Sequence, residues 1–173
     1  MNYVRDNLAV CGFLGIGSKE DFQKHGFHAQ LQCAEPFDSW LPDCVEVMRV
    51  PFDDGAPIPE RLFRQGQEWL GKHWDAGNKI LISCAGGHSR SVTMAIALLK
   101  TKCRLRFLDA AYEAIDRIPE AYPHPKVLAS AAGFCGETLN LEEIQSVFAH
   151  AKIQPPYPWS IELLREALRG VDA

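Results

Sequence analysis

The sequence lacks several features that would assign it to common classes of protein. No apolar run approaches the ~18 residues that a membrane-spanning helix needs. The N-terminal MNYVRDNLAV has neither the basic start nor the unbroken apolar stretch of a signal peptide. The six cysteines include no CxxC pair, and no close pairing of Cys or His indicates a zinc site. We therefore expect a cytoplasmic protein with free thiols that binds no membrane, metal or cofactor.

The chain also has little excess charge of either sign. It has 18 Lys and Arg residues against 22 Asp and Glu residues, a formal charge of -4. No global basic field therefore favours nucleic acid, and any affinity for phosphate must be local. The length of 173 residues, 47% of them hydrophobic, suits one core. We expect a monomer with a single domain over residues 1–173, made of a core at about 3–135 and a helical C-terminal extension at about 136–173.

Hydrophobic patterning predicts an α/β fold with a central, mostly parallel sheet flanked by helices. Short apolar runs bounded by turn residues predict strands at 8–14, 28–33, 45–50 and 79–84. Helical spacing or capping residues predict helices at about 18–24, 60–77, 91–99 and 107–118, and further helices from Lys126, Asn140 and Ser160. The PPYP segment at 155–158 is expected to be a rigid connector.

The stretch ISCAGGHSRS, residues 82–91, joins a predicted buried strand to a predicted helix. Such a loop directs its backbone N–H groups and the positive end of the helix dipole into one small volume, which suits an anion. Gly86 and Gly87 allow successive N–H groups to converge there. The thiolate form of Cys84 is favoured in the same field. Arg90 can bind two oxygens of a phosphoryl group from the opposite side.

The segment CAGGHSR resembles the signature of the protein tyrosine phosphatases, a cysteine and an arginine separated by five residues. Ser91, the order of elements and the small size are most similar to the dual-specificity branch, over roughly residues 3 to 132. The resemblance implies that Cys84 forms a phosphocysteine, that Arg90 stabilises the transition state, and that Ser91 assists departure of the thiolate. It also implies that the phosphate oxygens are bound by Ala85, Gly86, Gly87, His88, Ser89 and Arg90.

A departing alkoxide or phenoxide needs a proton, which the cysteine loop cannot supply at neutral pH. The proline-rich loop PFDDGAPIP, residues 51–59, carries two adjacent aspartates where the family has its general acid. Alignment of VPFDD with the family favours Asp54, and Asp53 is the alternative. Both could also be simple turn formers.

Three positions of this chain are set against the family pattern, and each involves a histidine that is missing, added or substituted. Ser83 stands where a histidine usually precedes the nucleophile. His88 lies outside the minimal signature and is either a solvated loop residue or a group that reads substrate charge. His124 follows Pro123 where relatives often carry an asparagine that faces the active site, and we favour a role at the start of a helix.

Three functional interpretations stay open. The first is a phosphatase of phosphotyrosine, or of phosphoserine and phosphothreonine, whose partner is a phosphorylated protein or a small phosphate monoester. The second is hydrolysis of a non-protein ester such as a phosphorylated sugar, lipid or RNA end. The third is a non-catalytic module that only binds phosphate. A purely structural alternative places Cys84 beside a glycine turn and Arg90 in a surface ion pair.

Overall fold

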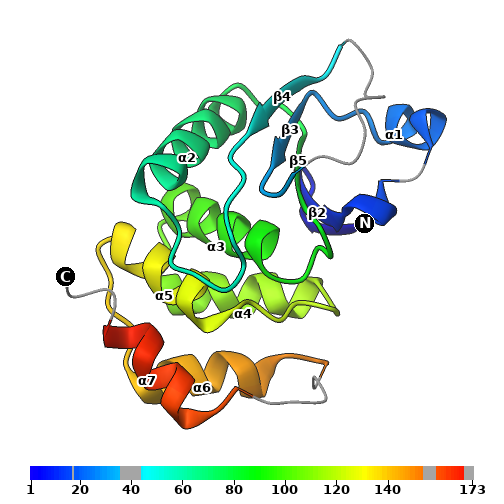
Figure 1. Ribbon diagram of the computed structural model, residues 1–173. Helices are drawn as coiled ribbons and strands as arrows, with labels where there is room; N and C mark the ends of the chain where they lie inside the picture. Colours follow the sequence, from blue (N-terminus) through cyan, green and yellow to red (C-terminus); the bar gives the residue numbers. More distant parts are fainter. Residues whose placement is uncertain (17, 36–43, 154–158, 170–173) are drawn as a thin grey trace.

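The computed structural model describes residues 1–16, 18–35, 44–153 and 159–169, and its centre is a sheet with strand order β1-β2-β5-β3-β4 (Figure 1). The strands are β1 (Asn2–Arg5), β2 (Leu8–Gly12), β3 (Ala29–Gln32), β4 (Glu46–Arg49) and β5 (Ile80–Cys84). β1 is antiparallel to β2, and every other neighbouring pair is parallel. The predicted mostly parallel sheet is confirmed.

Helices cover both faces of this sheet. They are α1 (Lys19–His25), α2 (Glu60–Asp75), α3 (Arg90–Cys103), α4 (Phe107–Arg117), α5 (Pro125–Phe134), α6 (Leu141–His150) and α7 (Ile161–Arg169). Leu8, Val10 and Ile82 face the larger core with α2 to α7, whereas Cys11 and Leu81 face a smaller core beside α1. This alternation is the period of two that a strand imposes, and it buries both faces of the sheet.

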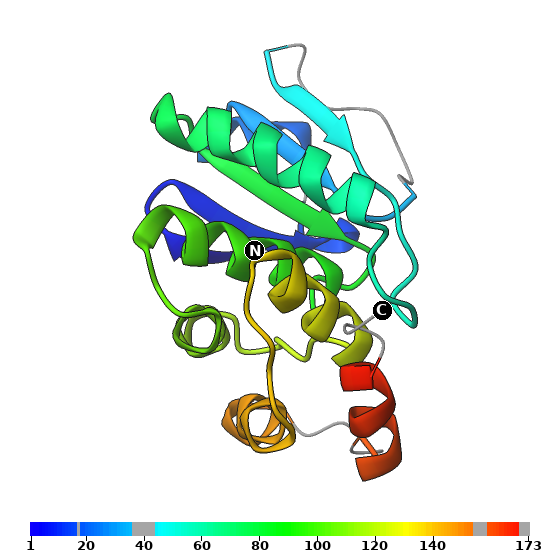
Figure 2. The same cartoon turned by 90° about the vertical axis from the view of Figure 1, so that its left-hand side faces the viewer.

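The C-terminal extension forms a separate tier on α4 and α5, away from the sheet (Figures 1 and 2). α6 begins with the predicted capping box: the Asn140 side chain accepts from the Glu143 N–H at 2.9 Å, and Glu143 accepts from the Asn140 N–H at 3.0 Å. No helix in the described ranges is long and apolar enough to cross a membrane. The predicted connector at 155–158 lies outside the described residues.

Two strand predictions need correction near the N-terminus. The predicted strand at 8–14 ends at Gly12, and Phe13–Gly15 form a 3-10 turn despite their apolar side chains. β1 was not predicted, because only one of its four residues is buried, two are partly exposed and one is exposed. It is defined by pairing with β2 rather than by a pattern of its own.

Candidate active site

The loop 84–90 leaves the central strand β5 and enters α3 directly. Gly87 has a φ of +79°, and a Cβ added there would lie 2.3 Å from the backbone nitrogen of Gly12. A Cβ on Gly12 would in turn lie 2.6 Å from the carbonyl carbon of Gly86. Only glycine fits at these two positions, so the backbone at the end of β2 packs directly against the backbone of the loop.

Cys84 lies at the base of this loop with its sulfur among hydrogen-bond donors. The side chain is 2% exposed. The backbone N–H of Gly87 donates to Cys84 Sγ at 3.3 Å, and the hydroxyl of Ser91 lies 3.1 Å from the same sulfur. The sulfur therefore lies at the N-terminus of α3, with a backbone N–H and a hydroxyl within hydrogen-bond distance.

Arg90 is the first residue of α3, and its guanidinium is held in place by one nitrogen. Nη1 donates to the backbone carbonyl of Phe52 at 3.0 Å. Nε is buried and has no hydrogen-bond partner among the described residues, so it keeps a donor for an anion. The bond to Phe52 also holds the proline-rich loop against the 84–90 loop. The described residues include no ion pair of Arg90, which contradicts the alternative of a surface ion pair.

Of the two candidate acids, Asp54 is the one that contacts the loop. Its carboxylate accepts a hydrogen bond from the hydroxyl of Ser89. Asp53 is exposed and makes no hydrogen bond or ion pair with the residues that the structure describes. This arrangement agrees with the preference for Asp54, whose role as the acid stays a prediction.

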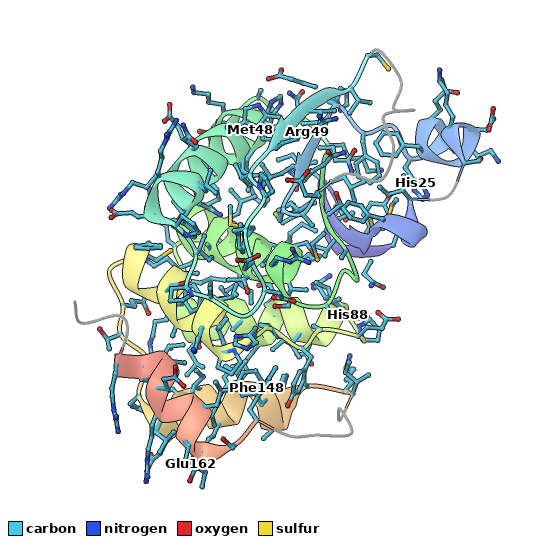
Figure 3. The ribbon with its side chains drawn as sticks, in the orientation of Figure 1. His25, Met48, Arg49, His88, Phe148 and Glu162 are labelled. Atoms are coloured by element: carbon cyan, nitrogen blue, oxygen red, sulfur yellow. The ribbon has the colours of Figure 1, made fainter. Side chains whose placement is uncertain are left out.

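His88 turns away from the centre of the loop and projects at the edge of the molecule (Figure 3). Its Nδ1 lies 2.8 Å from the carbonyl oxygen of Glu120. A carbonyl can only accept, so Nδ1 carries the proton and the ring binds the segment 119–124. The ring of His88 is therefore occupied in a protein contact, while its backbone remains in the loop.

At the position of the missing family histidine, Ser83 forms a buried polar pair. Gln30 Nε2 donates to Ser83 Oγ at 2.9 Å, and both side chains lie inside the sheet.

The segment 119–124 contacts the 84–90 loop through His124 and Tyr122, and Trp159 packs on both; sequence reasoning did not connect Tyr122 or Trp159 to the site. His124 is the N-cap of α5, as favoured, because its side chain accepts from the Lys126 N–H at 3.3 Å. Its backbone N–H donates to Ser89 Oγ at 2.8 Å, and the Tyr122 N–H donates to the carbonyl of His88 at 2.8 Å. Burial lowers the pKa of His124, and the nearby charge of Asp54 opposes that shift.

Cys11 and Cys33 lie close enough to Cys84 for a charge on its sulfur to raise their pKa values. Burial raises the pKa of Cys11 to about 12 and that of Cys33 well above its ordinary value, and a charge on Cys84 raises both further. Both thiols therefore stay protonated at neutral pH.

Known proteins resemble this chain in sequence over part of its length and in fold over most of it. No model of a protein family matches the chain. Over 112 residues, 62% of the chain, it is 30% identical to the dual specificity protein phosphatase PHS1 of Arabidopsis thaliana, of which it spans only 12%. The crystal structure of DUSP15 matches 85% of this chain and 91% of its own with a TM-score of 0.70 and 18% identity. That of human DUSP28 matches 87% and 100% with a TM-score of 0.67 and 19% identity.

The chain has the dual-specificity phosphatase fold. This confirms the resemblance that CAGGHSR indicated.

Proposed function

We propose that the protein is a phosphoric monoester hydrolase, a cysteine-dependent protein tyrosine or dual-specificity phosphatase. The observation that carries the proposal is the pairing of Cys84 with Arg90. The sulfur accepts from the Gly87 N–H and lies 3.1 Å from the Ser91 hydroxyl, and the buried Nε of Arg90 keeps an N–H with no protein acceptor among the described residues. A phosphoryl group bound to the loop would lie between a nucleophile and a fixed positive charge.

In the first step the thiolate of Cys84 attacks phosphorus. An S–P bond forms and the P–O ester bond breaks, with Arg90 and the loop N–H groups stabilising the charge on the phosphoryl oxygens. The leaving oxygen takes a proton from the carboxylic acid of Asp54. The products of this step are the free alcohol or phenol, phosphocysteine and the Asp54 carboxylate.

In the second step water attacks the phosphocysteine. The Asp54 carboxylate accepts a proton from the water, an O–P bond forms and the S–P bond breaks, which releases inorganic phosphate. The hydroxyl of Ser91, 3.1 Å from the sulfur, donates to the thiolate as it departs. Both groups then have the protonation state with which they began.

The charge around the loop favours a substrate with a single phosphoryl group, on a protein or a small molecule. The loop interior, residues 85–89, contains no Lys. The ring of His88 is engaged by the carbonyl of Glu120, and Asp53 and Glu120 add exposed negative charge nearby. A polyphosphorylated inositol lipid would meet the carboxylates of Asp53, Asp54 and Glu120 beside Arg90, which is unfavourable.

Turnover of p-nitrophenyl phosphate by the wild type and by Cys84→Ser tests the proposal. We expect the variant to lose activity by on the order of 10^4-fold or more, as removal of a nucleophile does. Cys135→Ser is the matched control, because that thiol lies in a groove away from the loop, and it should retain activity. Equal rates for wild type and Cys84→Ser would refute the covalent mechanism. Phosphate binding by a wild type without turnover would instead indicate a binding module.

A side-by-side panel of phosphopeptides, phosphosugars and phosphoinositides then assigns the substrate class. We expect the highest kcat/KM with phosphopeptides. Turnover confined to a sugar or lipid ester would overturn the protein-substrate assignment and leave the cysteine chemistry in place.

A further inference from the structure

We propose that Trp159 is a positioning residue of this site. From the C-terminal extension it holds the segment 119–124 against the 84–90 loop, and thereby keeps Ser89 in contact with Asp54. This inference rests on the proposed function, since it concerns how the proposed general acid is held.

The first contacts are aromatic. The ring of Trp159 stacks on Tyr122, with centroids 5.5 Å apart and an interplanar angle of 20°. It meets the ring of His124 edge-on at 4.8 Å. Phe148 of α6 completes the cluster, because its ring lies 5.3 Å from that of Tyr122 and 6.4 Å from that of Trp159. The segment 119–124 is therefore packed between the extension and the 84–90 loop, and aromatic pairs of this geometry favour one arrangement of the rings.

The second set of contacts joins the segment 119–124 to the 84–90 loop by three hydrogen bonds. His88 Nδ1 donates to the carbonyl of Glu120 at 2.8 Å, and the His88 carbonyl accepts from the Tyr122 N–H at 2.8 Å. The His124 N–H donates to Ser89 Oγ at 2.8 Å. Two of these bonds use the same residues, Tyr122 and His124, that Trp159 covers.

The bond from His124 decides what Ser89 can do. A backbone N–H can only donate, so it occupies a lone pair of Ser89 Oγ and leaves the single hydroxyl proton to point elsewhere. That proton is donated to Oδ1 of Asp54. With Oδ1 held in this way, Oδ2 is the oxygen available to carry the acidic proton toward a leaving group. Without the His124 N–H, the hydroxyl could rotate and Asp54 would lose its fixed partner.

The test is a comparison of leaving groups with Trp159→Leu and Trp159→Phe. A misplaced general acid slows esters with poor leaving groups, such as alkyl phosphates, and hardly affects aryl esters whose oxygen departs without a proton. We expect Trp159→Leu to reduce kcat/KM, which reports the first step, about 10-fold for poor leaving groups and less than about twofold for a dinitrophenyl ester. The 10-fold loss is a part of the 100-fold or more that a general acid supplies. The conservative Trp159→Phe keeps a stacking ring and should restore most of the loss.

The matched control is Phe134→Leu. Phe134 belongs to an aromatic pair with Phe63, 5.2 Å apart, and is the last residue of α5, at the other end of the helix from His124. We expect Phe134→Leu to leave the dependence on the leaving group unchanged. If Trp159→Leu slows all esters equally, or slows none, Trp159 has no positioning role and the inference is wrong.

A double-mutant cycle with Ser89→Ala checks the route of the effect. If Trp159 acts through Ser89, Trp159→Leu should cause no further selective loss in the Ser89→Ala background. Full additivity would overturn that route. Should Trp159→Leu not fold, Ser89→Ala alone decides, because wild-type rates with every leaving group would remove the link on which the inference depends. Failure of the proposed function is distinct, since it would appear as absent wild-type turnover.

Discussion

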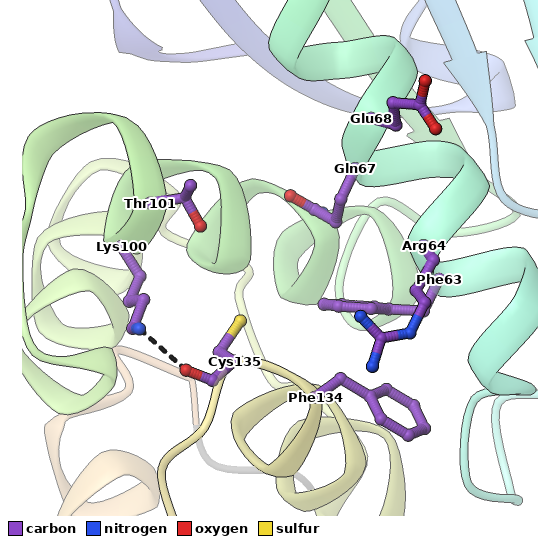
Figure 4. A pocket seen from close by; sticks show the side chains of 8 residues that line it. All are labelled: Phe63, Arg64, Gln67, Glu68, Lys100, Thr101, Phe134 and Cys135. Carbon is purple, nitrogen blue, oxygen red and sulfur yellow. Dashed lines mark hydrogen bonds between the residues drawn. The ribbon is translucent and has the colours of Figure 1, made fainter.

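Near each end of α3, a cysteine from another element lies close to a basic side chain of the helix. Cys84 ends β5 and lies near Arg90, whereas Cys135 follows α5 and lies near Lys100. The two sites differ in their hydrogen bonds and in the sign of the helix dipole. At the N-terminus, Cys84 accepts from the Gly87 N–H and lies 3.1 Å from the hydroxyl of Ser91, and Arg90 is the first residue of the helix. At the C-terminal end, Cys135 borders an open groove of about 490 Å³ between α2, α3 and α5, near Lys100 (Figure 4). The helix dipole is positive at the first site and negative at the second.

The surroundings of Cys135 keep its thiol protonated at neutral pH. Burial raises the pKa of Cys135 to about 11, and the charge of Lys100 offsets only part of that rise. Lys100 Nζ is itself engaged, donating to the Cys135 carbonyl at 2.8 Å and pairing with Glu137 at 3.6 Å. A cysteine beside a cation is therefore not enough for the proposed reaction. The Cys84 site differs from the Cys135 site because a backbone N–H donates to its sulfur and because the guanidinium of Arg90 keeps an unpaired N–H.

The largest expected effect in this comparison comes from exchanging the two cations. Arg90→Lys removes the planar fork and the bond to Phe52, and we expect kcat/KM for p-nitrophenyl phosphate to fall about 100- to 1,000-fold. The reverse exchange, Lys100→Arg, should change it less than about twofold, because nothing near the groove takes part in the reaction. Equal losses in the two variants would mean that the ends of α3 are not functionally distinct.

A smaller effect is expected from the carboxylates beside the first site. Asp54→Asn should lower kcat about 100-fold for an ester with a poor leaving group and remove the fall in rate toward alkaline pH, because an amide cannot act as the acid. Asp53→Asn, the matched control, should keep the wild-type pH profile. If instead Asp53→Asn abolishes the alkaline limb and Asp54→Asn retains it, the acid has been assigned to the wrong residue.

The smallest difference to be measured is the pH dependence of alkylation. A thiol with a pKa of about 11 stays protonated until the pH approaches that value, so at pH 8 about one Cys135 in a thousand is a thiolate. Iodoacetamide should therefore modify Cys84 near neutral pH, with loss of activity, and modify Cys135 and Cys11 in the folded protein only as the pH rises toward 11 and 12. Peptide mapping by mass spectrometry measures this.

The exposed Cys44 serves as the internal reference for that reaction. Modification of Cys135 as fast as Cys84 at neutral pH would show that the two thiols do not differ in the way their neighbours imply.

Local chemistry made the centre of the site predictable from sequence. The strand, the glycines and the helix start all lie within residues 80–91, so the position of Cys84 and Arg90 follows from chain order alone. The capping box at Asn140 is equally local. By contrast, the choice between Asp53 and Asp54 depended on an alignment, because only packing shows which carboxylate meets Ser89.

The rest of the site depends on contacts between distant segments. Tyr122 and Trp159 are brought together by the packing of α5, α6 and α7, and no spacing in the sequence signals that pair. The same holds for β1, which exists because β2 offers it backbone partners. The N-cap role of His124 was favoured from sequence, whereas its bond to Ser89 was not.

The central claim is that Cys84 carries the phosphoryl group between the two steps. Rapid mixing of the wild-type enzyme with an aryl phosphate, a denaturing quench and mass spectrometry of the Cys84 peptide test it directly. The account predicts one phosphoryl group on the sulfur of Cys84, formed as fast as the first burst of phenol and absent from Cys84→Ser. Sustained turnover with no phosphoryl group on Cys84, or with the group on another residue of the loop, would contradict it.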